Sequence, residues 1–257
     1  MSIRRVPVPF STRAPTGETA AYVVGDSDAL VVDPAAWTDD LATAARDADA
    51  SHVAITHHHP DHIDGVADAV AALGLTVWAR ATSAAEFAST TGVAPDRTFR
   101  PGDTIPVAGG VETIDTPGHA PEHLAFSTPA GLVCGDLAVA EGSVVVGAPD
   151  GDMRAYLSSL RRVHARNPAR LYPGHGPVID DPRAVCRRLI RHRLDRERRV
   201  ADAVAGGAST PDQILDVAYD KDISAVRDLA RATVVAHLEK LAVEGRVQWD
   251  GATARPP

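Results

Sequence analysis

The chain has 257 residues, enough for one large domain or for a main domain with a small additional one. Its two cysteines, Cys134 and Cys186, are too few for a framework of disulfides. The net charge of −8 suits a soluble protein, and no apolar run is long enough to span a membrane. Because the first ten residues lack the apolar core of a secretory signal, we expect a cytoplasmic protein with reduced thiols.

Short apolar runs alternate with helical patterns over residues 1–182. The expected strands are 19–26, 29–35, 52–56, 75–79, 111–116, 123–128 and 131–136. The expected helices begin at Ile63 and Ser83 and cover 152–166. Strands and helices mixed in this way predict an α/β sandwich.

Helical patterns alone follow over residues 183–257. A capping box with proline at the first helical position begins at Thr210. A longer helix is expected over 224–244, with Gly245 ending it and a short strand or wing after it. The sequence therefore predicts a small, helical, winged-helix-like domain, although a plain helical cap would give nearly the same pattern.

Seven arginines against Asp195 and Glu197 make residues 187–199 strongly basic. One interpretation is a solvated helix face with internal ion pairs. The other is a surface that binds an anion such as phosphate, CoA or nucleic acid. On the second interpretation, we expect Arg191 and Arg198 to bind an anionic part of the substrate.

Residues 56–65, THHHPDHIDG, hold four of the eleven histidines. A strand runs into this segment, and alternation along a strand places His57 and His59 on one face. Pro60 stops the strand and can open a helix, so Asp61 and His62 fall close to the same point. Imidazole and carboxylate groups together favour zinc and similar divalent metals.

Three further donors each follow an apolar, strand-like run and lie on a short loop. They are His119 in TPGH, Asp136 in CGD and His175 in PGHG. Loops at one end of a sheet are where functional sites are commonly built. We therefore expect these side chains to complete the ligand set of the histidine-rich segment.

The order H-x-H-x-D-H, TPGH, GD, PGHG over residues 18–178 resembles the metallo-β-lactamase superfamily. The resemblance implies a four-layer αβ/βα sandwich with two metals at one edge. By position, it implies that site one comprises His57, His59 and His119, that site two comprises Asp61, His62 and His175, and that Asp136 bridges the two metals. It also implies that Asp33 supports the ligands, and that His123 either orients substrate or has a packing or hydrogen-bonding role. His58 has no role in the pattern.

The implied cofactors are two divalent ions, with zinc the first choice and manganese or iron the alternatives. In such a site a hydroxide shared by two metals attacks a carbonyl or phosphoryl group. Asp61 is expected to bind a metal and to orient this hydroxide. Because all seven predicted ligands precede residue 182, we expect hydrolysis itself not to need residues 186–257.

Two branches of the superfamily fit the chain. The THHHPDH loop resembles glyoxalase II, and the C-terminal part resembles a lactamase-beta-like branch with a winged helix and an HR-x-x-RE signature, here residues 192–197. A thiolate leaves without a proton, and no lysine or tyrosine near the motifs is an obvious acid, which favours a thioester or an activated ester. The predicted substrates are therefore acyl-glutathione, acyl-CoA or acyl-carrier thioesters.

Two alternatives stay open: a single-strand endoribonuclease, and a non-enzymatic winged-helix protein that binds nucleic acid. The expected partner is a small or carrier-linked anionic substrate, or RNA, and not a membrane.

Overall fold

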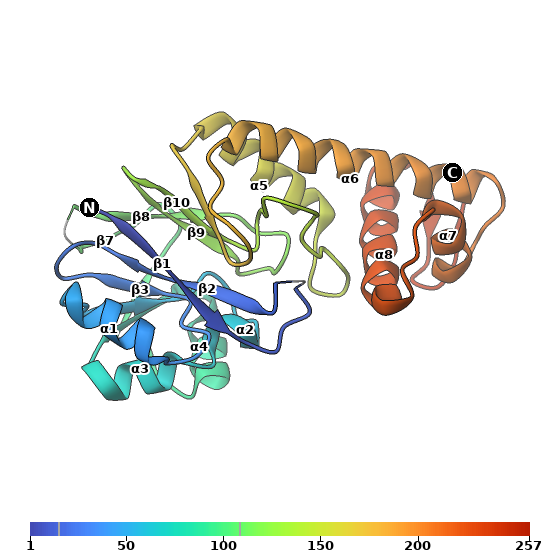
Figure 1. The fold of residues 1–257 in the computed structure, drawn as a ribbon. Coiled ribbons are helices and arrows are strands. Elements are labelled where there is room, and N and C mark those ends of the chain that lie inside the picture. The colour runs from blue at the N-terminus through green and yellow to red at the C-terminus, as the bar shows by residue number, and fades with distance from the viewer. Residues whose placement is uncertain (15, 108) are drawn as a thin grey trace.

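Two β-sheets packed face to face form the centre of the larger part of the molecule (Figure 1). The computed structural model describes residues 1–14, 16–107 and 109–257. The first sheet contains, in spatial order, β1 (Ile3–Pro9), β2 (Glu18–Val24), β3 (Leu30–Val32), β4 (His52–Ala54), β5 (Thr76–Arg80) and β6 (Arg97–Phe99). The second contains β11 (Leu171–Pro173), β10 (Gly131–Gly135), β9 (Leu124–Thr128), β8 (Val111–Asp115) and β7 (Thr104–Ile105).

Helices cover the outer face of each sheet. On the first sheet lie α1 (Asp39–Asp47), α3 (Val66–Leu73) and α4 (Ala84–Thr91); on the second lie α5 (Met153–Arg166) and the first half of α6 (Pro182–Ala205). A separate apolar cluster, which includes Tyr22 and Phe126, fills the space between the sheets. The arrangement is the predicted four-layer αβ/βα sandwich.

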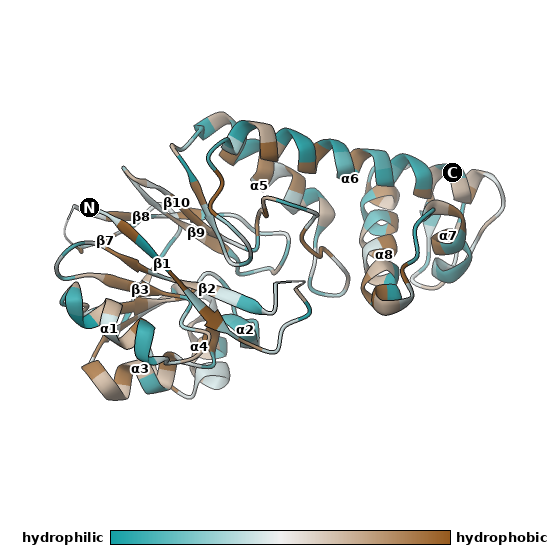
Figure 2. Cartoon of the chain, viewed as in Figure 1, coloured by the Kyte–Doolittle hydropathy of each residue, from teal (hydrophilic) through white to brown (hydrophobic). Residues whose placement is uncertain are grey.

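Strand β2 shows how the sequence builds two cores at once. Ala21 and Val23 pack toward the helical layer, whereas Ala20, Tyr22 and Val24 pack toward the second sheet. Neighbouring residues of a strand point to opposite faces, so a strand that is apolar at every position is buried on both sides. The strands are accordingly hydrophobic, and α6 is mostly hydrophilic (Figure 2).

Helix α1 and strands β1, β6 and β7 are among the elements of the sandwich that have no counterpart in the sequence prediction. Strand β1 contains Pro7 and Pro9, which argue against a central strand. It occupies an edge of its sheet, where a missing backbone N–H group is tolerated. The helix expected from Ile63 is in fact two helices, α2 (Pro60–Ile63) and α3.

The C-terminal part consists of the second half of α6, α7 (Pro211–Ala218), a single 3₁₀ turn η2 (Ser224–Val226), α8 (Arg227–Val243) and the hairpin β12 (Gln248–Trp249) and β13 (Ala254–Arg255). Helix α7 begins with the predicted capping box at Thr210. Helix α6 begins at Pro182 and packs in both parts of the molecule, so it crosses the expected boundary between residues 182 and 183. Leu189 belongs to the core under the second sheet, and Val200 belongs to the C-terminal core. None of the helices described is both long and apolar enough to cross a bilayer.

Candidate metal centre

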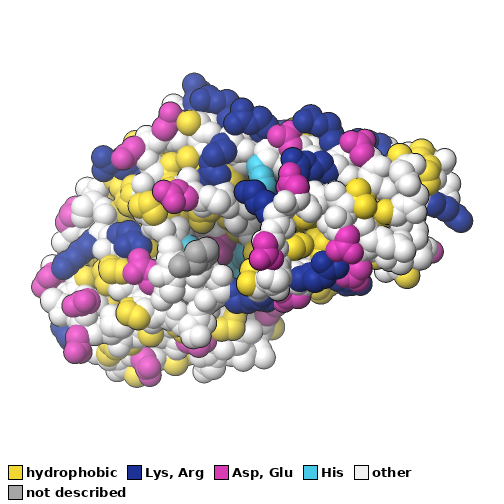
Figure 3. Space-filling view, turned by 45° about the vertical axis from the view of Figure 1, so that its right-hand side comes forward, with side chains coloured by type: hydrophobic (Ala, Val, Ile, Leu, Met, Phe, Trp, Pro, Cys, Tyr) yellow, Lys and Arg dark blue, Asp and Glu magenta, His cyan; other side chains and the backbone are white. Residues whose placement is uncertain are grey.

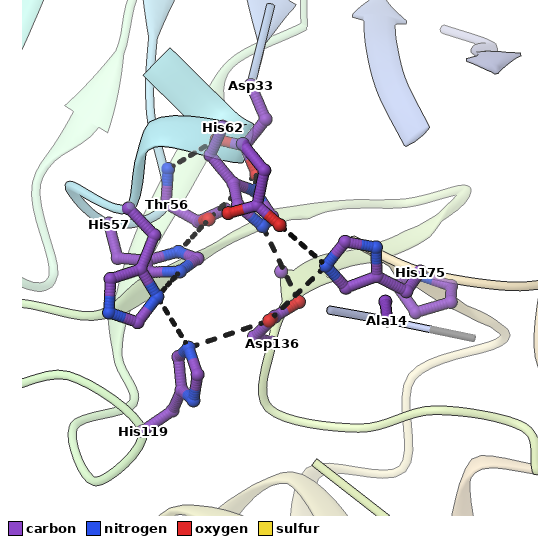
Figure 4. Close-up of polar contacts among 12 residues, drawn as sticks. Ala14, Asp33, Thr56, His57, His62, His119, Asp136 and His175 are labelled. Atoms are coloured by element: carbon purple, nitrogen blue, oxygen red, sulfur yellow. Dashed lines mark hydrogen bonds and ion pairs between the residues drawn. The ribbon is translucent and has the colours of Figure 1, made fainter. Parts of the chain in front are cut away.

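The predicted ligands come together at one edge of the sandwich, because each lies on or near a loop that follows a strand (Figure 4). His57 and His59 follow β4, His119 lies between β8 and β9, Asp136 directly follows β10, and His175 follows β11. Asp61 and His62 lie on α2, which Pro60 opens at its first position. We call these seven side chains the donor cluster: His57, His59, Asp61, His62, His119, Asp136 and His175.

The donor cluster contains two groups with the membership expected for sites one and two. In the first group, Nδ1 of His59 lies 2.9 Å from Nε2 of His57 and 2.9 Å from Nε2 of His119. In the second, Nε2 of His175 lies 3.4 Å from Oδ2 of Asp61, and a ligand atom of His62 lies within 4.8 Å of both. Each group therefore presents three donors to a space of the size of one ion.

Asp136 lies between the two groups. Its Oδ2 is 3.5 Å from Nε2 of His119 and 3.6 Å from Nε2 of His175. Its Oδ1 is 3.7 Å from Nε2 of His62. A β-carbon on Gly174 would lie 2.5 Å from this Oδ1, so only glycine permits the approach of β11 to the carboxylate.

The donor set fits a pair of divalent cations. Nε2 of His62 and Oδ1 of Asp136 are buried without a hydrogen-bond partner among the described residues. Buried polar atoms in native structures nearly always have a partner, and these two face each other across 3.7 Å. A cation between them would satisfy both atoms.

The second nitrogen of two ligands is fixed by a backbone carbonyl. Nδ1 of His119 lies 2.6 Å from the carbonyl oxygen of Val145. Nδ1 of His175 lies 2.9 Å from that of Glu18. Because a carbonyl oxygen can only accept, Nδ1 carries the proton in both rings, and the lone pair of Nε2 points into the donor cluster.

One carboxylate supports a ligand in each group. Asp33 is fully buried, and its Oδ2 accepts a hydrogen bond from Nδ1 of His62 at 2.9 Å. Oδ2 also accepts from the hydroxyl of Thr56 at 2.7 Å, while Oδ1 accepts from the Thr56 N–H at 2.6 Å. The Thr56 oxygen in turn lies 3.0 Å from Nδ1 of His57. Asp33 therefore contacts His62 directly and reaches His57 through Thr56.

The electrostatics of the donor cluster favour the ligand-competent forms of His57 and Asp136, but they favour the protonated form of His62, whose proton a metal must displace. Burial, together with the imidazoles of His62 and His119, holds the pKa of His57 well below its ordinary value. A neutral imidazole is the form that binds metal. For His62 burial acts in the same direction, but the Asp33 carboxylate outweighs it and raises the pKa to about 9. Burial opposes ionisation of Asp136, yet His62 and His119 keep its pKa below the ordinary value.

His123 is not placed to contact substrate. Its side chain is fully buried, its Nδ1 lies 2.9 Å from the Thr116 hydroxyl, and its Nε2 accepts a hydrogen bond from the Asp136 N–H at 3.1 Å. The hydrogen-bonding alternative is therefore the one that the structure displays. His58, for which no role was expected, points away from the donor cluster toward Glu86 and Glu122.

The basic stretch on α6 is largely engaged within the protein. Arg188 donates to the carbonyls of Val139 and Gly142, and Arg193 donates to that of Val144. Arg196 donates to the carbonyl of Ala218. These three side chains therefore link α6 to neighbouring backbone segments, and their bonded groups are not available to an external anion.

Arg191 and Arg198 lie apart from the donor cluster. Arg198 pairs with Asp195 at 2.5 Å, and Arg191 is exposed. Both line a shallow surface pocket with His164, and no member of the donor cluster lines it. Figure 3 shows Lys and Arg side chains gathered along the α6 edge of the molecule. The structure therefore gives no support to the expectation that these two arginines bind an anionic part of the substrate.

Two contributors to the site have no signal in the sequence. The Thr12 hydroxyl donates to Oδ2 of Asp61 at 2.6 Å across 49 positions. Val145 contacts His119 through its backbone carbonyl. Every residue type has this group, so the sequence gives no signal of the contact. Thr56 could have been inferred, because it directly precedes the histidine-rich segment at the end of a strand.

Comparison with known proteins agrees with this architecture. Residues 14–175 match the model of the metallo-beta-lactamase superfamily, and residues 210–255 match that of the beta-lactamase associated winged helix domain. The chain therefore belongs to the metallo-beta-lactamase superfamily and carries its associated winged helix. With the donor cluster, this identifies a metal-dependent hydrolase.

Relatives share both parts of the chain. It is 28% identical over 213 residues to a beta-lactamase-like protein 2 homolog of Caenorhabditis elegans, covering 80% of this chain and 69% of that protein. It is 25% identical to the probable metallo-hydrolase YqjP of Bacillus subtilis, covering 97% and 95%. The crystal structure of a metallo-beta-lactamase family protein from Thermus thermophilus superposes with a TM-score of 0.77 at 23% identity, covering 99% and 98%.

Proposed function

We propose that this hydrolase cleaves thioesters or activated esters of the acyl-glutathione, acyl-CoA or acyl-carrier type. The donor cluster would hold two divalent ions, with zinc the first choice and manganese or iron the alternatives. His57, His59 and His119 would form one site, Asp61, His62 and His175 the other, and Asp136 the bridge. When bound, the ions would supply Lewis-acid activation of the scissile carbonyl and of the attacking water.

Among the chain's own groups, Asp61 is best placed to orient the attacking water. Its side chain is partly exposed, and the Thr12 hydroxyl and His175 contact only one of its oxygens, Oδ2. Burial opposes its ionisation, but hydrogen bonding to His175 and the nearby His62 outweigh this and hold its pKa well below the ordinary value. Asp61 therefore stays ionised at neutral pH and can accept a hydrogen bond from water through Oδ1.

The preference for a thioester rests on the leaving group. A thiolate departs without a proton, whereas an alkoxide needs a proton from a general acid or from a metal-bound water. Tyr22 and Tyr156 donate their hydroxyls to the carbonyls of Pro173 and Leu137, and Tyr172 is buried between the sheets. The fourth tyrosine and both lysines belong to the C-terminal part. None of these groups is available at the donor cluster to protonate an alkoxide, and this is the observation that carries the proposal.

The structure gives less support to RNA cleavage. Three arginines of α6 are bonded to carbonyls, so they offer little to a phosphate backbone. The winged helix, residues 210–255, carries eight acidic and six basic side chains. Its two arginines at the start of α8, Arg227 and Arg231, pair with Asp212. Nucleic-acid binding depends on unpaired basic groups, so the winged helix is here better suited to a structural role.

A substrate panel tests the proposal. The protein, reconstituted separately with zinc, manganese and iron, is assayed on S-lactoylglutathione, several acyl-CoA thioesters, p-nitrophenyl acetate and fluorescent single-stranded RNA. Asp61→Asn is the control against contaminating activity. Thioester hydrolysis that disappears in this variant is expected. Cleavage of RNA alone, with thioesters untouched, would instead establish the ribonuclease.

A further inference from the structure

A segment without helix or strand, residues 139–152, holds one ligand of the donor cluster. It connects β10 to α5. Its Val145 carbonyl lies 2.6 Å from Nδ1 of His119, and its Asp152 N–H donates to the carbonyl of Gly118 at 2.9 Å. The turn that carries His119 therefore takes its position from this segment as well as from the strands on either side of it.

The segment lacks the regular backbone hydrogen bonds of a helix or strand, so its backbone groups bond to residues elsewhere in the chain. Arg188 donates to the carbonyls of Val139 at 2.8 Å and Gly142 at 2.5 Å. Arg193 donates to the carbonyl of Val144. On the other side, the N–H of Ala148 donates to a carbonyl of α8 at 3.1 Å. Every one of these partners lies beyond residue 182.

The surroundings of Arg193 indicate that its side chain holds the segment 139–152 in position. Its side chain is 3% exposed, and its guanidinium lies 5.5 Å from the ring centroid of Tyr156. Among the residues described, the buried carboxylate of Glu197 on the same helix pairs with Lys240 and Arg246 and not with Arg193. A buried guanidinium is costly unless its donors are used. Here Nη2 of Arg193 donates to the carbonyl of Val144, the residue that directly precedes Val145.

We infer that Arg193 is a positioning residue for His119. By fixing Val144, it keeps the Val145 carbonyl where it holds the His119 ring with Nε2 turned into the donor cluster. The inference rests on the proposed metal centre. It also argues against the expectation that hydrolysis does not need residues 186–257, since α6 reaches one of the ligands through two backbone residues.

Cobalt binding by the full-length protein tests this without an activity assay. Arg193→Met removes the donors and keeps an unbranched apolar stem. We expect its affinity for the ion at site one to fall about tenfold, the low end of the effect of removing a direct partner of a ligand, with altered visible absorption of bound Co²⁺. Arg196→Met is the matched control, because Arg196 lies on the same helix but stacks on Tyr219 and donates to the carbonyl of Ala218, both in the C-terminal part. It should leave cobalt affinity and spectrum unchanged.

The mechanism is separated from general destabilisation by a double-mutant cycle. In a His119→Gln background, Arg193→Met should have no further effect on cobalt affinity, since the group through which it acts is gone. Wild-type affinity and spectrum in Arg193→Met, or an equal loss in Arg196→Met, would overturn the inference. A wild-type protein that binds no cobalt would instead overturn the proposed centre itself.

If Arg193→Met does not fold, Arg193→Lys takes its place. Lysine keeps the charge but replaces the planar fork by a compact ammonium. A changed cobalt spectrum and an affinity lowered severalfold are expected, and a wild-type spectrum with wild-type affinity would contradict the inference.

Discussion

The carboxylate of Asp33 and the imidazole of His62 are joined by a hydrogen bond of 2.9 Å inside the fully buried wall of the site. Through Thr56, the same carboxylate also reaches His57 in the other group of ligands. One side chain thus orients a ligand in each proposed metal site.

Replacing Asp33 by asparagine should weaken metal binding at both sites. An amide oxygen is a weaker acceptor than a carboxylate, so both rings lose part of their support, and a loss of about 10- to 100-fold in affinity is expected. Competition with a chromogenic chelator measures it. Asp49→Asn is the matched control, because Asp49 has a positive φ, as Asp33 does, but its side chain is exposed. Unchanged affinity at both sites would show that Asp33 serves folding alone.

Asp61→Asn should lower turnover by about 100-fold or more, the range typical of a lost proton acceptor, while the melting temperature shifts little. The side chain is partly exposed, so few packing contacts change. Turnover on the best thioester of the panel and a thermal melt in the presence of metal are the two measurements. Asp64→Asn, at the exposed end of the same short helix, should behave as wild type. Equal turnover in all three proteins would remove Asp61 from the reacting centre.

Reversing Arg191 and Arg198 to glutamate should leave kcat/KM for an acyl-CoA within about twofold of wild type, since both groups are exposed and apart from the donor cluster. The salt dependence of KM should also stay the same, because exposed charges act only within roughly 8 Å at physiological ionic strength. A rise in KM for acyl-CoA, with a neutral ester unaffected, would restore the original expectation that these arginines bind an anionic part of the substrate.

Glu197 makes stability depend on acid pH. Burial opposes its ionisation, but the nearby His237 and the Lys240 ammonium, which lies 2.7 Å from Oε2, lower its pKa to about 2, against an ordinary value of 4.5. A lowered carboxyl pKa stabilises the fold above the ordinary value, and this contribution disappears as pH falls through about 2. The free energy of unfolding should therefore decrease between pH 4.5 and 2.

Urea unfolding at several pH values measures this contribution. Glu197→Gln should show lower stability at neutral pH and a flatter profile between pH 4.5 and 2, whereas Glu141→Gln, at an exposed position, should follow the wild type. A Glu197→Gln profile parallel to that of the wild type would contradict the account.

The sequence predicted the donor cluster well because ligand chemistry constrains residue type and because strand ends place loops together. His57 and His59 had to be histidines two apart, and Asp136 had to follow a strand. The role of Arg193 could not be predicted, since it bonds to a backbone carbonyl that any residue would offer. Local charge density suggested an anion site at 187–199, but Arg188, Arg193 and Arg196 of this stretch donate to backbone carbonyls of the fold. Strand β1 escaped prediction because its prolines are tolerated only at an edge, and edges are set by topology.

The central claim, that these seven side chains form a two-metal centre, is tested most directly by elemental analysis after reconstitution. Protein loaded with zinc, manganese or iron and freed of excess metal should contain close to two ions per chain. Asp136→Ala should reduce this number, because the residue between the two groups is lost. A wild-type metal content near zero with all three metals would contradict the account.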